Sequence, residues 1–170
     1  MVIRPAQFNL YLGLVLLALA TGCQTGDKAK PMAILRVHME VSPSETAMNS
    51  PVPVYRANPV MVNVDQNPIL TESDIVSAEL LDVPGGFVIQ VRFDPHGSMV
   101  LNQYFTANPG RHYAVFSEFG AGKFILKRWL AAPLLPNRPT GGTLTFTPDA
   151  DRTEAQEIVD GLNNAVKDRN

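Results

Sequence analysis

The chain has 170 residues, of which 45% are hydrophobic and 18% are charged, and its 14 basic and 16 acidic residues give a net charge of −2. This length fits a single domain with a sizeable core. The charge balance argues against a nucleic-acid partner, and a single cysteine excludes an intramolecular disulfide.

The first 22 residues have the layout of an export signal. Arg4 supplies a positive start, an apolar stretch runs from 8 to 20, and small residues precede Cys23. The stretch is shorter than the roughly 20 apolar residues that cross a bilayer. Residues 19–23, Leu-Ala-Thr-Gly-Cys, resemble the lipobox of bacterial lipoproteins. This resemblance implies that Cys23 carries lipid and that the residues before it are removed.

These features divide the chain into three predicted parts: a lipoprotein signal peptide at 1–22, a polar tether at 23–32 and a single domain at 33–170. Gln24 follows the cysteine, and by the sorting rule of the enteric lipoproteins that this segment resembles, a residue other than Asp there favours the outer membrane. We therefore expect a protein of the cell envelope that is anchored through lipid on Cys23, faces the periplasm and lies in the outer rather than the inner membrane.

The domain is predicted to start with two strands. Leu35, Val37 and Met39 alternate with polar residues, which predicts a strand that turns His38 toward solvent. Residues 42–53 are rich in Ser, Pro, Asn and Thr and are predicted to form a loop. A second strand follows at 60–64. Because four prolines lie between 51 and 68, we expect this region at an edge of the sheet or as a cover over it.

A helical turn, a hairpin and a helix are predicted next. Residues 71–74 favour a helical turn, and Gly85-Gly86 after 75–83 indicates a hairpin that leads into a core strand at 87–93. Asp94 and Pro95 suit the N-cap and first position of a helix that ends at 108–110. One side of this helix carries Val100, Leu101, Tyr104 and Phe105.

The rest of the chain alternates strands and turns before a final helix. Residues 111–119 are apolar on both faces, which predicts a central strand, and a glycine turn at 120–122 returns the chain through 123–130. Prolines at 133, 136 and 139 predict an extended crossing toward a last strand at 143–147. Asp151 and Glu154 form a capping-box pattern. The helix that follows has apolar residues at helical spacing, namely Ala155, Ile158, Val159, Leu162 and Val166.

Together these elements predict an α+β fold, in which two helices pack on one face of a mainly antiparallel sheet to form a two-layer sandwich. The other face of the sheet is expected to be wetter. Arg92, Lys127 and Arg128 are assigned to a partner surface on it, together with Trp129. Trp and Arg are frequent in binding hot spots, although Trp129 also suits packing at the end of a sheet.

No catalytic motif is found in the sequence. Residues 120–123 suggest a phosphate-binding loop, but Ser117 and Phe124 stand where that motif requires Gly and Ser or Thr. No Gly-X-Ser-X-Gly elbow is present, and the single cysteine is assigned to lipid. We therefore predict that the chain has no catalytic residue and no cofactor.

The three histidines are also dispersed. His38, His96 and His112 lack the close spacing of common zinc motifs. A metal or acid–base site would require the fold to bring His96 and His112 together with Glu118. The sequence therefore predicts no metal site.

A series of short motifs spans residues from about 74 to 162. In order they are Asp74-Ile75, Ala78, Phe93-Asp94, Gly97, Phe105-Thr106, Asn108, Gly110-Arg111, Ala132-Pro133, Gly141-Gly142, Phe146-Thr147-Pro148 and Glu154-Ala155-Gln156. Their order and spacing resemble the periplasmic head subdomain of the protein-export subunit SecD. SecD couples export to the proton gradient through its membrane-spanning part, and no such segment follows the signal here. The resemblance therefore implies the fold and a surface that contacts envelope proteins or chains in transit.

Two functions are compatible with these observations. The first is a non-enzymatic, lipid-anchored envelope protein whose SecD head-like domain binds a protein partner as an accessory to protein export. The second is a small ligand-binding domain or hydrolase of the envelope with a site near the crossing from Pro133 to Gly142. A concave pocket lined by convergent polar groups would favour the second.

Overall fold

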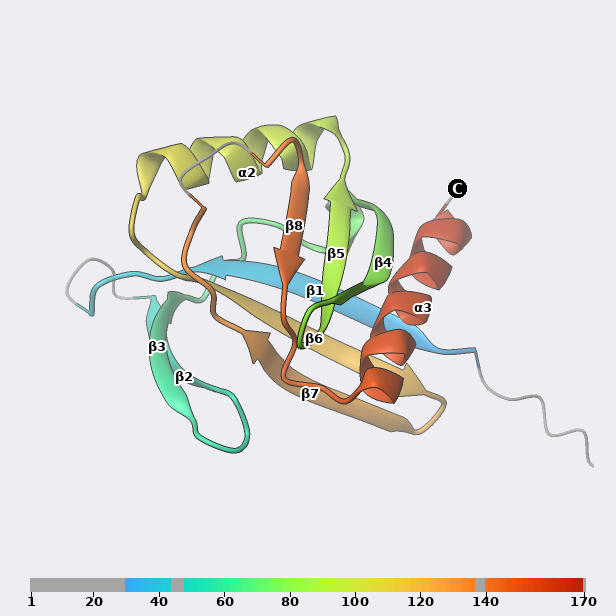
Figure 1. Cartoon of the computed structure of the whole chain (residues 1–170). Coiled ribbons are helices and arrows are strands. Elements are labelled where there is room, and N and C mark those ends of the chain that lie inside the picture. Colours follow the sequence, from blue (N-terminus) through green and yellow to red (C-terminus); the bar gives the residue numbers. More distant parts are fainter. Residues whose placement is uncertain (1–29, 44–47, 137–139, 170) are drawn as a thin grey trace, which may run out of the picture.

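The structure is a computed structural model that describes residues 30–43, 48–136 and 140–169 (Figure 1). The predicted signal peptide, Cys23 and the tether up to residue 29 lie outside these residues. Within the described ranges, no helix has both the length and the apolar character needed to span a membrane.

The described chain forms eight strands, one short 3-10 helix and two α-helices. In order they are β1 (Met32–Met39), β2 (Asn49–Val54), β3 (Val60–Asp65), η1 (Glu72–Asp74), β4 (Ile75–Val83), β5 (Gly86–Phe93), α2 (Pro95–Ala107), β6 (Tyr113–Ala121), β7 (Phe124–Ala131), β8 (Thr143–Phe146) and α3 (Arg152–Arg169). All strand pairs are antiparallel. The strands form three sheets, with the orders β1-β6-β7, β2-β3 and β4-β5-β8.

One main core joins the two three-stranded sheets and both helices. Figure 1 shows β4, β5 and β8 running across β1, β6 and β7, with α3 alongside. The α+β class with antiparallel strands and two helices is confirmed, and the structure adds that the strands are divided among three sheets. The most buried side chains of this core include Leu35, Ile75, Ile89, Leu101, Phe119, Leu130, Leu144, Ile158 and Leu162.

The hairpin of β2 and β3 covers the outer face of the β1-β6-β7 sheet. Val52, Val54, Val62 and Val64 form a second small core there with Ala114 of β6. The predicted loop at 42–53 is therefore wrong in its last part, because β2 begins at residue 49. Pro51 and Pro53 are exposed while the valines between and after them are buried. A two-stranded edge tolerates proline in this way because no further strand needs the missing N–H.

The same hairpin explains why the prediction for His38 is wrong. The strand alternation places Leu35, Val37 and Met39 in the main core as expected, but His38 on the opposite face is buried as well. Its Nδ1 lies 2.8 Å from the carbonyl oxygen of Asp65 on β3. Alternation shows which residues lie on each face of a strand, but it does not show whether the second face is covered. Here the distant β2-β3 hairpin covers it.

The pH dependence of stability follows from this burial. Burial lowers the pKa of His38 from its ordinary value of 6.5, and the charge of Arg36 lowers it further. The hydrogen bond to the Asp65 carbonyl and the charge of Asp65 raise the pKa, but they do not outweigh the burial. The unfolded chain then binds more protons, so the free energy of unfolding should fall as the pH drops through about 6.5. Denaturant unfolding measures the free energy of unfolding at about pH 7.5 and 5.5, and the decrease between the two should be smaller for His38→Phe than for the wild type. Equal decreases would show that His38 is not the source of this pH dependence.

The predicted turns and caps are confirmed. Thr71 and Asp74 form a capping box around η1, and Asp94 accepts a hydrogen bond from the backbone N–H of Gly97 at the start of α2. Asp151 and Glu154 exchange hydrogen bonds before α3. On α2, Leu101 and Phe105 are buried, whereas Tyr104, expected on the same side, is exposed. The turns and caps are local features, because each depends on residues only a few positions apart.

Candidate functional site

The structure does not bring the four predicted partner-surface residues together on one sheet. Lys127, Arg128 and Trp129 are consecutive on β7, whereas Arg92 lies on β5, in a different sheet. The Nε of Arg92 donates to the hydroxyl of Ser77 on the neighbouring strand. The expectation that Arg92 shares one sheet face with Lys127 or Arg128 is therefore wrong, because β5 and β7 belong to separate sheets.

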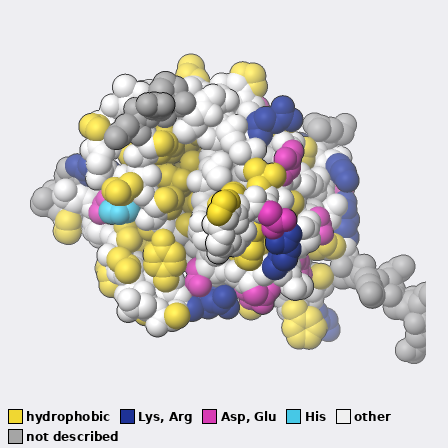
Figure 2. All heavy atoms as spheres, viewed as in Figure 1, with side chains coloured by type: hydrophobic (Ala, Val, Ile, Leu, Met, Phe, Trp, Pro, Cys, Tyr) yellow, Lys and Arg dark blue, Asp and Glu magenta, His cyan; other side chains and the backbone are white. Residues whose placement is uncertain are grey.

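A depression lies beside β7 where the turn of the β2-β3 hairpin meets it. We call it the hairpin depression, and it has a volume of about 320 Å³. Figure 2 shows hydrophobic side chains gathered over β2 and β3 on the left of the view. The depression is lined by Pro53, Tyr55, Arg56, Pro59, Lys127, Arg128, Trp129 and Asp149. Sequence reasoning missed the residues from the hairpin turn and Asp149, since nothing local in the sequence places them beside β7.

Ion pairs fix the hairpin turn to the start of α3. The backbone N–H of Arg56 donates to Oδ2 of Asp149 at 2.8 Å, and its guanidinium lies 3.4 Å from Oε2 of Glu154. The same carboxylate oxygen lies 3.0 Å from Nη2 of Arg128, whose side chain is largely buried. Glu154 therefore joins the hairpin, β7 and α3, which preorganises one wall of the hairpin depression.

Glu154→Gln is expected to lower the free energy of unfolding by about 1–2 kcal/mol, because it removes the charge that pairs with the largely buried Arg128. Chemical denaturation measures this loss. Lys127→Gln is the matched control, since it removes the exposed pair that Lys127 makes with Glu118 at 2.9 Å, and such pairs contribute about 0–1 kcal/mol. A larger loss for the control than for Glu154→Gln would contradict the assignment.

Trp129 is half-buried and contributes to both packing and lining. Its ring lies edge-on to His38 at 5.1 Å and tilted against Phe116 at 5.2 Å, measured between ring centroids. It also packs against the small core of the β2-β3 hairpin. The packing role considered from the sequence is therefore present, and part of the residue lines the hairpin depression.

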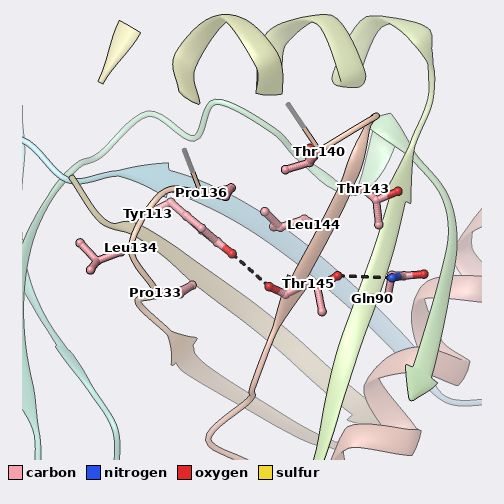
Figure 3. Close-up of a pocket in the computed structure, with 9 residues that line it drawn as sticks. All are labelled: Gln90, Tyr113, Pro133, Leu134, Pro136, Thr140, Thr143, Leu144 and Thr145. Carbon is pink, nitrogen blue, oxygen red and sulfur yellow. Dashed lines mark hydrogen bonds between the residues drawn. The ribbon is translucent and has the colours of Figure 1, made fainter. Parts of the chain in front are cut away.

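A second depression lies at the crossing from Pro133 to Gly142, where the alternative site was expected. We call it the threonine depression, and its volume is about 490 Å³. Figure 3 shows its lining side chains between β8, the Pro133–Pro136 segment and the β6 residue Tyr113. The Tyr113 hydroxyl donates to the backbone carbonyl of Thr145, and Gln90 donates to the Thr145 hydroxyl.

The chemistry of the threonine depression is that of hydrogen bonding. Its polar lining residues are Gln90, Tyr113, Thr140, Thr143 and Thr145. Among the described residues of this lining, Tyr113 is the one that can ionise, and burial raises the pKa of its phenol well above the ordinary value of 10. The described lining therefore suits recognition of a polar ligand through hydrogen bonds.

The histidines are placed apart. His96 lies in the first turn of α2, beside Asp74 of η1. The Nδ1 of His112 lies 2.8 Å from Oε2 of Glu40. Glu118 pairs with Lys127 instead. The group that a metal or acid–base site required, His96 with His112 and Glu118, is therefore not formed.

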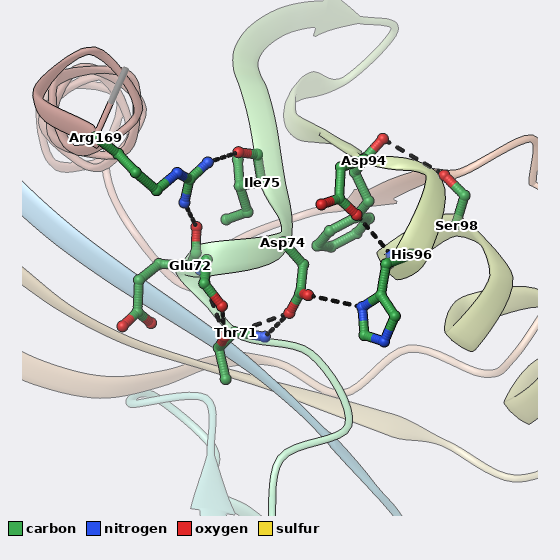
Figure 4. Close-up of polar contacts among 11 residues, drawn as sticks. Thr71, Glu72, Asp74, Ile75, Asp94, His96, Ser98 and Arg169 are labelled. Atoms are coloured by element: carbon green, nitrogen blue, oxygen red, sulfur yellow. Dashed lines mark hydrogen bonds and ion pairs between the residues drawn. The ribbon is translucent and has the colours of Figure 1, made fainter.

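One group of metal-type ligands is nevertheless present among the described residues. Donor atoms of Asp74, Asp94 and His96 lie within 4.8 Å of one another (Figure 4). Both carboxylates already hold the backbone, since Asp74 accepts from the N–H of Thr71 and Asp94 from the N–H of Gly97. His96 is two-thirds exposed. Helix and turn capping accounts for this arrangement without a bound ion.

The comparisons with known proteins identify the fold. No family model matches the sequence, and no curated protein matches it. The solved structures that share its architecture include two of SecDF. One is described as a membrane component, SecDF, that enhances protein export, with a TM-score of 0.51 and 16% identity. The other is SecDF in a Super-membrane-facing form, with a TM-score of 0.53 and 16% identity.

The domain has a SecD head-like fold. Each match covers 95% of this chain, so the likeness extends well beyond the motifs between about 74 and 162. The chain spans 70% of the first SecDF chain and 21% of the second. The resemblance predicted from the motifs at about 74–162 is thus confirmed at the level of the fold.

Proposed function

We propose that this protein is a non-enzymatic, lipid-anchored protein of the cell envelope, whose SecD head-like domain binds a protein partner as an accessory to protein export. The observation that carries the proposal is the fold shared with SecDF, which is described as enhancing protein export. Lipid on Cys23 would hold the domain on the periplasmic side of a membrane, with the outer membrane favoured by Gln24.

The hairpin depression is proposed as the centre of the partner surface. It combines Tyr55 and Trp129 with the basic residues Arg56, Lys127 and Arg128. Aromatic residues and arginine dominate binding hot spots because they offer a large contact area together with directed hydrogen bonds. Its wall is held in place by Glu154, so that little ordering is needed on binding.

A second candidate function is supported by the threonine depression. Neutral hydroxyl and amide groups from β5, β6 and β8 converge there with two prolines. Such a lining would hold an uncharged polar ligand, which makes this the ligand-binding alternative rather than a hydrolase.

The test is photo-crosslinking in intact cells that produce the full chain. Probe amino acids are placed at Lys127 for the hairpin depression, at Leu134 for the threonine depression, and at exposed Gln103 on α2 as the control. We expect a component of the export machinery to be captured from position 127 and not from 103. Capture of no envelope protein from a folded, lipidated chain would overturn the proposal. Stabilisation by a small polar ligand, lost on Thr145→Val, would favour the second candidate.

A matched pair of tyrosine variants tests the same surface by function. Tyr55 and Tyr104 are similarly exposed, at 39% and 38%, but only Tyr55 lines the hairpin depression. Tyr55 has a φ of 70°, a conformation that Asn tolerates well. We expect Tyr55→Asn to lower crosslinking from position 127 by at least fivefold, while Tyr104→Asn leaves it unchanged. Equal effects of the two variants would exclude the hairpin depression as the contact.

A further inference from the structure

The turn between β6 and β7 carries an unusually exposed apolar group. Phe124 is 86% exposed, whereas the next most exposed large hydrophobic residues among those described, Met99 and Leu134, reach 61% and 60%. Ile125 and Leu126 follow it on β7 at 45% and 49%. Three consecutive apolar side chains are thus exposed at one end of a hairpin, with Phe124 and Leu126 on one face of β7 and Ile125 on the other. Exposed apolar groups gathered in one place commonly mark an interaction site.

The start of the domain lies at the same end. Met32, which is 43% exposed, pairs with Gly120 at the end of β6, and a shallow hollow of about 250 Å³ joins Met32 to Ile125. We call Met32, Phe124, Ile125 and Leu126 the apolar tip. Figure 2 shows hydrophobic and basic side chains projecting together at the lower right, where Figure 1 places the β6-β7 turn.

Lysines surround the apolar tip. Lys123 lies in the turn itself, and no ion pair involves it within the described part of the chain. Lys127 pairs with Glu118, and Lys30 pairs with Asp168 at 2.7 Å. Aromatic and aliphatic residues flanked by lysine match the layout of segments that enter the headgroup region of a bilayer, because lysine keeps its ammonium in water while its stem covers apolar surface.

The length of chain before the domain brings this end close to the predicted anchor. Seven residue steps separate Cys23 from Lys30, the first described residue. An extended chain of that length spans at most roughly 25 Å. Lipid on Cys23 would therefore keep the start of β1, and with it the apolar tip, near the membrane surface.

We propose that the apolar tip inserts into the headgroup region of the membrane that holds the lipid on Cys23, with Phe124 as the leading side chain. This inference rests on the proposed lipid anchor and not on the role in export. It gives the domain an orientation, because the β2-β3 turn lies away from the apolar tip in Figure 1. The hairpin depression then stays open to the periplasm.

The test uses fluorescence quenching by lipid. The chain from Gln24 contains the whole core, whose residues lie between 33 and 162, and it lacks the single native cysteine. An N-terminal histidine tag holds it on phosphatidylcholine vesicles that contain a nickel-chelating lipid and a quencher attached to lipid chains. A fluorophore is placed by Ala121→Cys beside the apolar tip, or by Ala57→Cys in the exposed β2-β3 turn as the matched control.

We expect quenching at position 121 to exceed that at 57 by at least threefold, and Phe124→Asp to remove the difference. Equal quenching at the two positions would overturn the proposal. If the fluorescence at position 121 changed with the density of protein on the vesicles and not with the amount of quencher, a second copy of the chain would cover the apolar tip. That result would also overturn the proposal. Because the tag replaces the native lipid, this result is independent of lipidation, which mass spectrometry of the full mature chain tests separately.

Discussion

Phe119→Ala is expected to lower the free energy of unfolding by about 3–5 kcal/mol, the largest loss that we predict for a single substitution. Phe119 lies on β6, the central strand of its sheet, and is 1% exposed. The guanidinium of Arg128 lies over its ring, 5.2 Å from the centroid. Truncation would leave a cavity in the core, and the Arg128 guanidinium would lose the ring that it packs against. Urea denaturation followed by Trp129 fluorescence measures the loss.

Phe124→Ala is the matched control, since it removes the same side chain from the same hairpin. Phe124 is 86% exposed, so its loss should change stability by about 0.5 kcal/mol or less. A loss above about 2 kcal/mol for Phe124→Ala would show that the residue packs in solution, and would remove the basis for the apolar tip. If Phe124→Ala kept the stability of the wild type but lost contact with the membrane, Phe124 would act in membrane binding and not in folding.

Gly161→Ala is expected to destabilise the protein by about 2–3 kcal/mol, although alanine is the better helix former by about 1 kcal/mol. Gly161 is buried within α3, where the helix meets the start of β1. A Cβ at this position would lie 2.6 Å from the backbone N of Ala33 and from the backbone C of Met32. Backbone atoms of a paired strand have little room to move, so α3 and β1 would have to separate.

Asp160→Ala, one position earlier on the exposed side of α3, is the control for helix propensity. Its stability should change by about 0.5 kcal/mol or less. Differential scanning calorimetry of both variants gives the comparison. If Gly161→Ala were as stable as Asp160→Ala, the close approach of α3 to β1 would not exist in solution.

The elements that could be predicted from the sequence are those whose signals are local. The β4-β5 hairpin follows from its glycine turn, and α2 begins where Asp94 and Pro95 indicate. The final helix follows from its apolar spacing and its capping box. Each depends on hydrogen bonds or periodicity within a few residues, so the surrounding fold does not need to be known.

The candidate site was predicted less completely. The segment 127–129 was identified from its Trp and basic residues, yet Tyr55, Arg56 and Asp149, which complete the hairpin depression, were not. Proline-rich composition predicted a loop where β2 forms. No local pattern could show that this hairpin would fold back over β7, because the lining residues that the two contribute are at least 68 positions apart, as Pro59 and Lys127 are.

Local patterns in the sequence are enough to establish the class of the fold, the positions of most turns and caps, and the set of short motifs that resemble SecD. The three-dimensional packing was needed to show that three sheets form, that His38 is buried, that Gly161 must lack a side chain, and that the β2-β3 hairpin and β7 share a depression. The physical reason is that secondary structure depends on hydrogen bonds and periodicity between near neighbours. Burial depends on which distant part of the chain packs over a surface and excludes water from it. In this chain that part is the β2-β3 hairpin, whose first strand lies in a sequence that favours a loop.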